Sequence, residues 1–324
     1  MNTSTNMALN NKWISATLLA AAASFGVAIS AANAAPPDRA RSTSTTAAPT
    51  TSEDPFANLP ATMSLDAIVR DFKARNETGG HPDFEAYTNS YITTGLVRNQ
   101  LDSDGKPVFN AARGMQITSS YKDHTGRIIN PAMYNAAAGD TAGSMSMGGS
   151  DQLSGSERFA QWYRDVSGTN ASMRVPLVFN RIPNTARYVF DSATDAPYRA
   201  RGGFFPIDGE LLGNFGSTGH NFSFTTEIST TFLFEREKNH VFTFTGDDDV
   251  WVFIDGKLVL DLGGTHPRQE QSLELNRLSW LTDGQTHTLK VFHAERHTNG
   301  SNFRIETSLQ LTRVEAPPTT AMYD

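Results

Sequence analysis

The sequence predicts a mainly β protein, an antiparallel β-barrel or sandwich with an N-terminal extension and one short α-helix. Between residues 174 and 311, short segments rich in Val, Phe, Ile and Thr recur at even spacing between Gly-rich turns, which is typical of such folds. The chain has 20 Phe, which supply bulk for a core, and no Cys. Stability must therefore come from packing, because disulfides and zinc-thiolate sites are excluded.

The N-terminus predicts an export signal over residues 1–34. A polar start that carries Lys12 as its only charge leads into the apolar stretch 13–29, and Ala32 and Ala34 fit the small-residue rule for cleavage. Ser and Thr interrupt the apolar stretch, which makes it too short and too weak for a membrane span. We therefore expect a protein without a membrane span that is secreted, extracellular or at the cell surface, with the periplasm as an alternative.

Three further segments are biased in composition. Residues 35–58, rich in Ala, Pro, Ser and Thr, predict a disordered linker, and residues 316–324 predict a disordered tail. Residues 135–156, dominated by Ala, Gly, Ser and Met, predict a mobile insertion within a folded domain over residues 59–315. The formal net charge is −7, which, without basic clusters, argues against nucleic acid and anionic membranes as partners.

One helix and a series of strands are expected in the folded domain. The helix should span residues 157–166, because Phe159 and Trp162 follow helical spacing there and would face the core. Ser154 or Ser156 would cap it. The strands are expected at residues 175–179, 186–190, 222–226, 230–234, 241–245, 250–254, 257–262, 287–294 and 303–311.

The most informative stretch is an acidic loop between two of these strands. Asp247, Asp248 and Asp249 are adjacent, and Asp255-Gly256 then forms a two-residue hairpin turn after the next strand. Neighbouring carboxylates repel one another unless a cation neutralises them, and Ca²⁺ prefers such oxygen ligands. The alternative is a solvated acidic turn, since Asp and Gly are common turn residues.

A second group of polar residues follows the last long strand. His293, Glu295 and His297 alternate, so they would share one strand face. A transition-metal site is one interpretation, but the helical His-Glu-x-x-His pattern is absent, and hydrogen bonding at the strand end is favoured. The polar turns 213–221 and 297–303 could contact sugars or could be plain hairpin turns. No nucleophile elbow or phosphate loop occurs, so no catalytic residues are expected.

Several of these motifs together resemble the fibro-slime domain. They are the segments 81–85, 95–97, 105–107, 161–166, 204–209, 220–222, 246–264 with His266, and 292–303. The resemblance covers residues 65–311, with a β core at about 174–311. That domain is in turn similar to the β-barrel first defined in anthrax protective antigen, which also occurs in flocculins, adhesins and some glycosidases.

The resemblance implies a Ca²⁺ cofactor and a glycan partner. In the lectin members an Asp-Asp pair joined by a cis peptide binds calcium, which places the pair at Asp247-Asp248 here. Asn299 is implied as the ligand from the second loop, with Asn302 as the alternative, and His297 joins these residues as a sugar contact. The expected function is calcium-dependent carbohydrate binding, of lectin or adhesin type, without enzyme activity. The alternatives are a structural matrix protein whose calcium only stiffens a loop and, less favoured, a secreted hydrolase.

Overall fold

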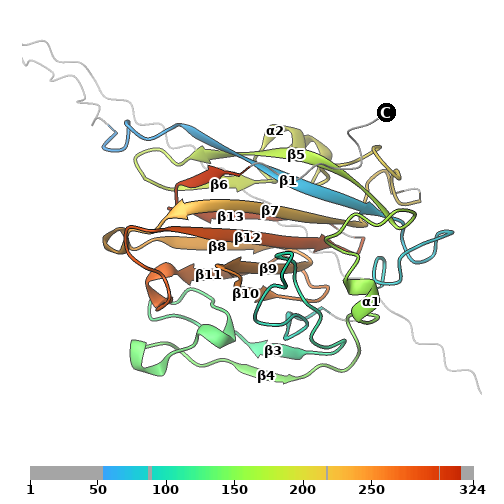
Figure 1. Cartoon of the computed structure of the whole chain (residues 1–324), viewed down its shortest axis with the longest axis horizontal. Helices are drawn as coiled ribbons and strands as arrows, with labels where there is room; N and C mark the ends of the chain where they lie inside the picture. The colour runs from blue at the N-terminus through green and yellow to red at the C-terminus, as the bar shows by residue number, and fades with distance from the viewer. Residues whose placement is uncertain (1–53, 87–89, 217, 299, 315–324) are drawn as a thin grey trace, which may run out of the picture. The chain divides into compact units, whose positions relative to one another are not determined.

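The computed structural model describes residues 54–86, 90–216, 218–298 and 300–314 (Figure 1). The expected export signal, most of the linker and the tail lie outside these residues. The described part is mainly β and is built on one large antiparallel sheet, so the predicted fold class is confirmed. None of the helices in the described ranges is long and apolar enough to cross a membrane.

The large sheet runs in the order β10-β9-β12-β7-β1-β5-β6-β13-β8-β11, and β14 pairs with β7. Its strands are β1 (Thr62–Phe72), β5 (Asn170–Arg181), β6 (Tyr188–Asp191), β7 (Phe224–Leu233), β8 (Val241–Gly246), β9 (Asp249–Ile254), β10 (Lys257–Leu262), β11 (Gln269–Glu274), β12 (Thr286–Glu295), β13 (Phe303–Thr307) and β14 (Leu311–Arg313). A second sheet contains β2 (Thr93–Thr94), β3 (Met115–Ser119) and β4 (Ser144–Met147). The helical elements are α1 (Ser156–Phe159), α2 (Ala196–Arg201) and the short 3₁₀ turns η1 (Pro131–Met133), η2 (Ala136–Ala138), η3 (Arg236–Lys238) and η4 (Leu275–Arg277).

The large sheet is nearly closed, because its two end strands meet through one side chain. The Gln271 side chain on β11 donates from Nε2 to the Asp261 carbonyl on β10 at 3.0 Å and accepts from the Asp261 amide at 3.0 Å. Gln271 is fully buried, so these bonds satisfy a polar group that would otherwise be costly to bury. A side chain thus replaces part of a strand ladder at the seam.

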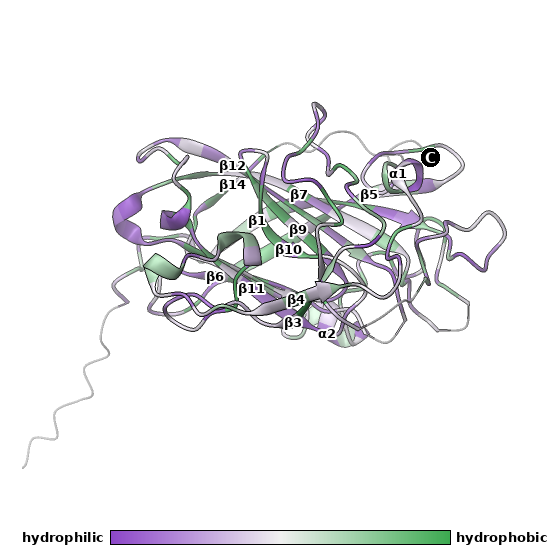
Figure 2. Cartoon of the chain, turned by 90° about the horizontal axis from the view of Figure 1, so that it is seen from below, coloured by the Kyte–Doolittle hydropathy of each residue, from purple (hydrophilic) through white to green (hydrophobic). Residues whose placement is uncertain are grey.

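Both faces of the central strands are buried, which places the core on two sides of the sheet. On β9, Val250, Val252 and Ile254 join a large interior cluster, whereas Trp251 and Phe253 join a second cluster on the opposite face. Aromatic residues from the region around α1 cover that second face. Figure 2 shows β9 and β10 as hydrophobic strands within more polar surroundings. The continuous burial explains why these strands read as apolar runs in the sequence.

Segments before β5 also cover the outer edges of β10 and β11, the two end strands of the large sheet. The amide of Leu258 on β10 donates to the Asn99 carbonyl at 3.0 Å, and the amide of Ser272 on β11 donates to the Ile128 carbonyl at 2.7 Å. An uncovered edge would be a template for pairing with another chain. The region 90–150 therefore protects both end strands.

The structure corrects several local predictions. The expected helix over 157–166 is only α1, and Gly155 precedes it without a side-chain cap. Beyond Phe159 the chain turns so that Trp162 packs in the aromatic cluster, where its Nε1 donates to Asp83 at 3.2 Å. Tertiary packing thus outweighs local helical spacing. The expected mobile insertion 135–156 contains η2, β4 and the start of α1.

Other differences concern the strands. The two strands expected at 222–226 and 230–234 are the single strand β7, and the one expected at 303–311 is divided into β13 and β14. β11 and α2 were not predicted. β1 lies in the large sheet between β7 and β5, although its sequence suggests only short elements.

Asp71 at the end of β1 gives the fold a testable pH dependence. Its buried carboxylate accepts from the Leu212 amide and from Asn221 Nδ2, both at 2.7 Å. Burial raises the pKa of Asp71 from 3.8 to about 7, against the effect of these bonds. Between these values the folded state holds a proton that the unfolded state lacks, so this contribution to stability is complete below about pH 4 and is lost as the pH rises to about 7.

We expect Asp71→Asn to remove that contribution. The free energy of unfolding of wild type minus that of the variant should fall as the pH is raised between these limits, by an amount on the order of a few kcal/mol. Urea denaturation of both proteins at several pH values measures the difference. A difference that rises with pH, or stays constant, would contradict the assignment.

Candidate functional site

The acidic loop joins β8 to β9 and brings its three carboxylates into three different environments. The Asp247-Asp248 peptide bond is cis, as the resemblance implied. The hairpin after β9 is also as predicted, with positive φ at Asp255 (49°) and Gly256 (75°).

Asp247 is held by the loop that precedes β13. The Asn302 amide donates to Asp247 Oδ1 at 2.5 Å, and Asn302 Nδ2 donates to Oδ2 at 2.8 Å. Burial raises the pKa of Asp247, against the hydrogen bonds from Asn302. Asn302 therefore orients a predicted metal ligand and connects the two loops.

Asp248 accepts two backbone hydrogen bonds from different segments. The amide of His266 donates to Oδ1 at 3.1 Å, and the amide of Arg296 donates to Oδ2 at 3.1 Å. Burial raises the pKa of Asp248 well above its usual value, although the positive charge of Arg296 opposes the shift. The charges of the neighbouring aspartates raise it further, so burial and repulsion together outweigh the two backbone bonds and the charge of Arg296.

Asp249 differs from its neighbours because it forms a fully buried ion pair. Arg296 Nε donates to Asp249 Oδ2 at 2.6 Å, both side chains have no exposed surface, and the Gly264 amide donates to Oδ1 at 2.6 Å. Arg296 Nη1 also donates to the carbonyls of Asp83 at 3.2 Å and Gln152 at 3.1 Å. The bonds of Asp249 and Arg296 thus connect five chain segments behind the site.

Glu295 adds another buried carboxylate at the end of β12. It has no exposed surface, and its Oε2 accepts no hydrogen bond from the described residues. The nearby Ser301 hydroxyl donates to the Phe204 carbonyl at 2.8 Å. Burial, followed by the charges of Asp248 and Asp247, raises the pKa of Glu295 well above its usual value. The carboxylates of Asp247, Asp248 and Glu295 are therefore close enough to affect one another.

His293 contributes no positive charge to this cluster at neutral pH. Burial lowers its pKa to about 4, and its Nε2 lies 2.9 Å from the Asp247 carbonyl oxygen. A neutral imidazole whose Nε2 carries the proton donates to that carbonyl. His293 thus has a hydrogen-bonding contact of the kind favoured by the sequence.

A pocket of about 350 Å³ opens beside Asp247 and Asp248. Its other lining residues are Ser90, Thr265, His266, Pro267, His297, Thr298 and Gly300. The acidic loop and the loop after β12 therefore meet at one cavity, as the resemblance implied. Glu85 Oε1 anchors the second loop by accepting from the Thr298 amide at 2.8 Å.

Only some of the predicted site residues line this pocket. Asp247, Asp248 and His297 line it, whereas Asn302 is bonded to Asp247 and is not among the lining residues. Asn299 lies outside the described residues. Nowhere in the described ranges do three His, Asp or Glu side chains converge on one point in the manner of a metal site. A cation here would need backbone and ligand oxygens as well.

Sequence reasoning did not identify Arg296, and it considered Glu295 only as part of a metal site with histidines. Arg296 is 47 residues from Asp249, and no periodicity links the two. A faint signal was present: an Arg directly after an apolar strand, among acids, is a candidate for a buried ion pair.

Comparison with known proteins finds a family match in about the last third of the chain. Residues 207–321 match the PA14 domain family. This range contains β7 to β14 and, apart from Ser90, all residues that line the pocket.

The chain is also similar to several proteins from Dictyostelium discoideum. Protein psiQ is 31% identical over 271 residues, which cover 79% of this chain and 22% of psiQ. Protein psiH is 40% identical over 146 residues, covering 45% of this chain and 20% of psiH, and protein psiD is 30% identical over 258 residues, covering 76% and 42%. The chain therefore spans about a fifth to two fifths of the length of these relatives. Among solved structures, the PA14 domain of the MpAFP antifreeze protein aligns with 79% of this chain and 95% of its own, at 10% identity and a TM-score of 0.23.

Proposed function

We propose that residues 59–315 form an exported, calcium-dependent carbohydrate-binding module of the fibro-slime type, which acts as a lectin or adhesin at the cell surface or in extracellular matrix. One observation carries this proposal. Asp247 and Asp248 are buried at the pocket wall and Glu295 is buried near both, while the guanidinium of Arg296 is already paired with Asp249. In the described part of the chain, none of these three acids is paired with a cationic side chain of its own, so their ionised forms would be a surplus of negative charge that a bound cation would compensate.

A bound calcium ion would compensate the negative charge of these carboxylates. The Oε2 atom of Glu295 is without a hydrogen-bond donor among the described residues, and Asp247 and Asp248 both border an open pocket. Calcium takes about six to eight oxygen ligands and tolerates irregular geometry, so two carboxylates leave room for backbone carbonyls and ligand hydroxyls. We propose Asp247 and Asp248 as protein ligands, with Asn299 from the second loop. The bound ion would offset the repulsion among the acids.

The groups around the pocket suit a polyhydroxylated ligand. Thr265, Thr298 and His297 offer side chains that donate and accept hydrogen bonds at its wall. The match of residues 207–321 to the PA14 domain, a carbohydrate-binding and adhesin-type module, supports a glycan as the partner. The proposed role of this chain's own residues is to orient the sugar and to exclude water from the cation. No catalytic step is proposed for them.

The function is tested by retention of the mature protein on immobilised polysaccharides and on a glycan array. We expect retention with calcium and release by a chelator, because the sugar would bind partly through the ion. Calcium binding without retention of any glycan would overturn the lectin proposal. It would favour the structural alternative, in which calcium only stiffens the loop. Turnover of a sugar substrate would instead indicate a hydrolase.

A further inference from the structure

A second groove lies at the end of the sheet opposite the acidic loop. Strand pairing places Gly246 and Asp249 at one end, and Val241, Ile254 and Lys257 at the other. At this second end two pockets, of about 550 and 640 Å³, share Ala132, Met133 and Trp280 as lining residues. The two pockets therefore adjoin around these three residues, and we refer to the pair as the groove. We propose that this groove binds an extended, uncharged oligosaccharide, independently of calcium.

The groove combines a flat aromatic side chain with many amides. Trp280 is partly exposed and borders both halves, next to Met133. Five amide side chains line it, and those of Asn99, Gln100 and Asn135 are exposed. Asn130 is buried and bonded to Val259 and Ala132, and Asn276 Nδ2 donates to Arg236 and Asn239. Each pocket has the volume typical of a small-molecule site, so the joined groove suits a chain of several units. An indole presents an apolar face to sugar C–H groups, while amides bond hydroxyls as donors and acceptors.

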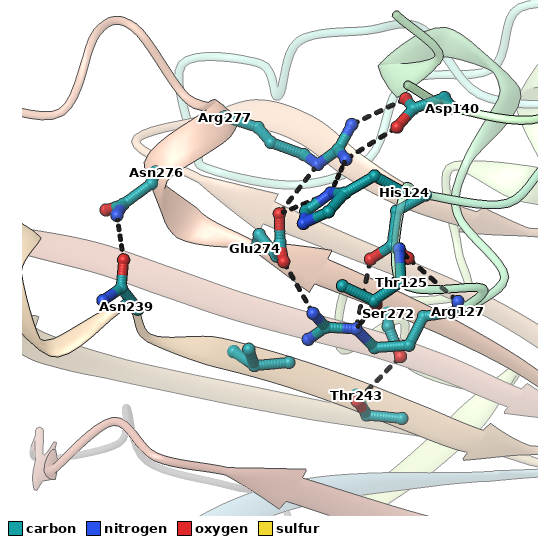
Figure 3. A network of polar contacts seen from close by, with 12 residues as sticks. His124, Thr125, Arg127, Asp140, Asn239, Thr243, Ser272, Glu274, Asn276 and Arg277 are labelled. Atoms are coloured by element: carbon teal, nitrogen blue, oxygen red, sulfur yellow. Dashed lines mark hydrogen bonds and ion pairs between the residues drawn. The ribbon is translucent and has the colours of Figure 1, made fainter. Parts of the chain in front are cut away.

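The charged residues of one half are already satisfied, as Figure 3 shows. Arg277 donates to both Asp140 oxygens, at 2.7 and 2.8 Å, and to Glu274 at 3.2 Å. Glu274 also accepts from Arg127 at 2.6 Å, and His124 Nδ1 lies 3.3 Å from Arg277 Nη2. This network ties the region before β4 to β11 and η4. It leaves no isolated charge in this half that would select a charged ligand.

The charged residues of the other half also have contacts within the protein. Lys257 Nζ lies 4.5 Å from the centre of the Trp280 ring, a cation–π contact that occupies the ammonium group. Asp261 accepts from the Gly95 amide at 2.9 Å and from Trp251 Nε1 at 3.1 Å, and burial raises its pKa to about 7. The residues that line the two pockets include two cations, Lys257 and Arg277, and two acids, Asp261 and Glu274, so neither sign of charge is in excess. Charge complementarity therefore favours a neutral ligand along the whole groove.

An extended peptide is a poorer fit for the same groove. Peptides bind sheet proteins well when they add a strand to a free edge. Here the edge of β10 is occupied, because Leu258 donates to the Asn99 carbonyl and Leu101 donates to the Gly256 carbonyl, both at 3.0 Å. The edge of β11 is occupied by Ile128. The exposed amides of Asn99, Gln100 and Asn135 are the hydrogen-bonding groups that the groove presents to a ligand.

The test is a titration of the calcium-free protein, in chelator, with a panel of neutral oligosaccharides that includes cellohexaose, laminarihexaose and mannohexaose. Trp162 and Trp251 are fully buried, and the fourth Trp, Trp13, lies in the expected export signal. In the protein without residues 1–34, a change in tryptophan fluorescence would therefore report on Trp280. At least one neutral hexasaccharide should bind wild type, and Trp280→Ala should weaken it by about tenfold or more. Trp280→Phe should restore part of the affinity and guards against a folding defect. Tyr91→Ala, which removes an exposed aromatic outside the groove, should change affinity less than about threefold.

The proposal is independent of the calcium site, so the two can fail separately. The Asp247→Asn, Asp248→Asn double variant should bind the same hexasaccharide as wild type does. The groove assignment would be overturned by binding that needs calcium, by equal affinity of wild type and Trp280→Ala, or by the absence of binding across the panel. Binding of oligogalacturonate or of a peptide in preference to the neutral sugars would also overturn it.

Discussion

Replacing Arg296 by methionine is expected to lower the free energy of unfolding by about 3 to 5 kcal/mol. The change leaves Asp249 as an unpaired charge with no exposed surface, and it removes the donors to the carbonyls of Asp83 and Gln152. It also removes a cation that lies 5.1 Å from the centre of the Trp162 ring. Methionine fills much of the same volume, so the loss should come from polar groups and not from a cavity. Denaturant unfolding with an unchanged m-value measures it.

Two variants isolate the cause. Arg113→Met breaks an exposed pair with Asp151 at 3.0 Å, and it should cost less than about 1 kcal/mol because water and salt screen that pair. Adding Asp249→Leu to Arg296→Met should recover part of the stability, since the stranded charge is then gone. Equal costs for Arg296→Met and Arg113→Met, or no recovery in the double variant, would show that the buried pair is not the reason.

Parts of the fold were predictable where a single segment contains both a turn motif and an apolar run. The bounds of β10 follow from the turn at Asp255-Gly256 and from an apolar run, because the hairpin turn fixes where both strands begin and end. β11 gave no such signal: its Gln and Glu residues suggest a solvated loop. It is a strand because β8 pairs with it and because Gln271 closes the sheet against Asp261. That arrangement depends on residues that meet only in the folded chain.

The candidate site, like the fold, was predictable only in part. The family resemblance implied that the acidic loop and the turn after β12 meet, and the pocket lined by Asp247, Asp248 and His297 agrees with this. Adjacent aspartates look equivalent in a sequence, but the structure gives Asp249 a guanidinium partner and leaves the other two without one. The difference arises from long-range packing around Arg296. Local spacing cannot reveal which of three neighbouring acids is neutralised.

The Asp247→Asn, Asp248→Asn double variant should lose calcium binding altogether. Both changes keep the side-chain volume but remove the two charges that border the pocket, and neutral amides cannot replace two carboxylates for a divalent cation. At a hundredfold excess over the dissociation constant, calcium should stabilise wild type by about 2.7 kcal/mol and should leave the variant unchanged. Isothermal calorimetry and melting temperatures with and without calcium measure both effects.

A matched pair of acids provides the control for this last prediction. Asp102→Asn with Asp104→Asn also removes two carboxylates from one loop, but neither residue lines the proposed calcium pocket, so calcium should still bind and stabilise that protein. Unchanged calcium affinity after the changes at Asp247 and Asp248 would remove the metal assignment. If calcium binding is lost, glycan retention distinguishes a lectin from a structural protein. A lectin must lose calcium and glycan together in the Asp247 and Asp248 variant. A protein in which calcium only stiffens the loop would lose stability and would have no glycan binding to lose at this pocket.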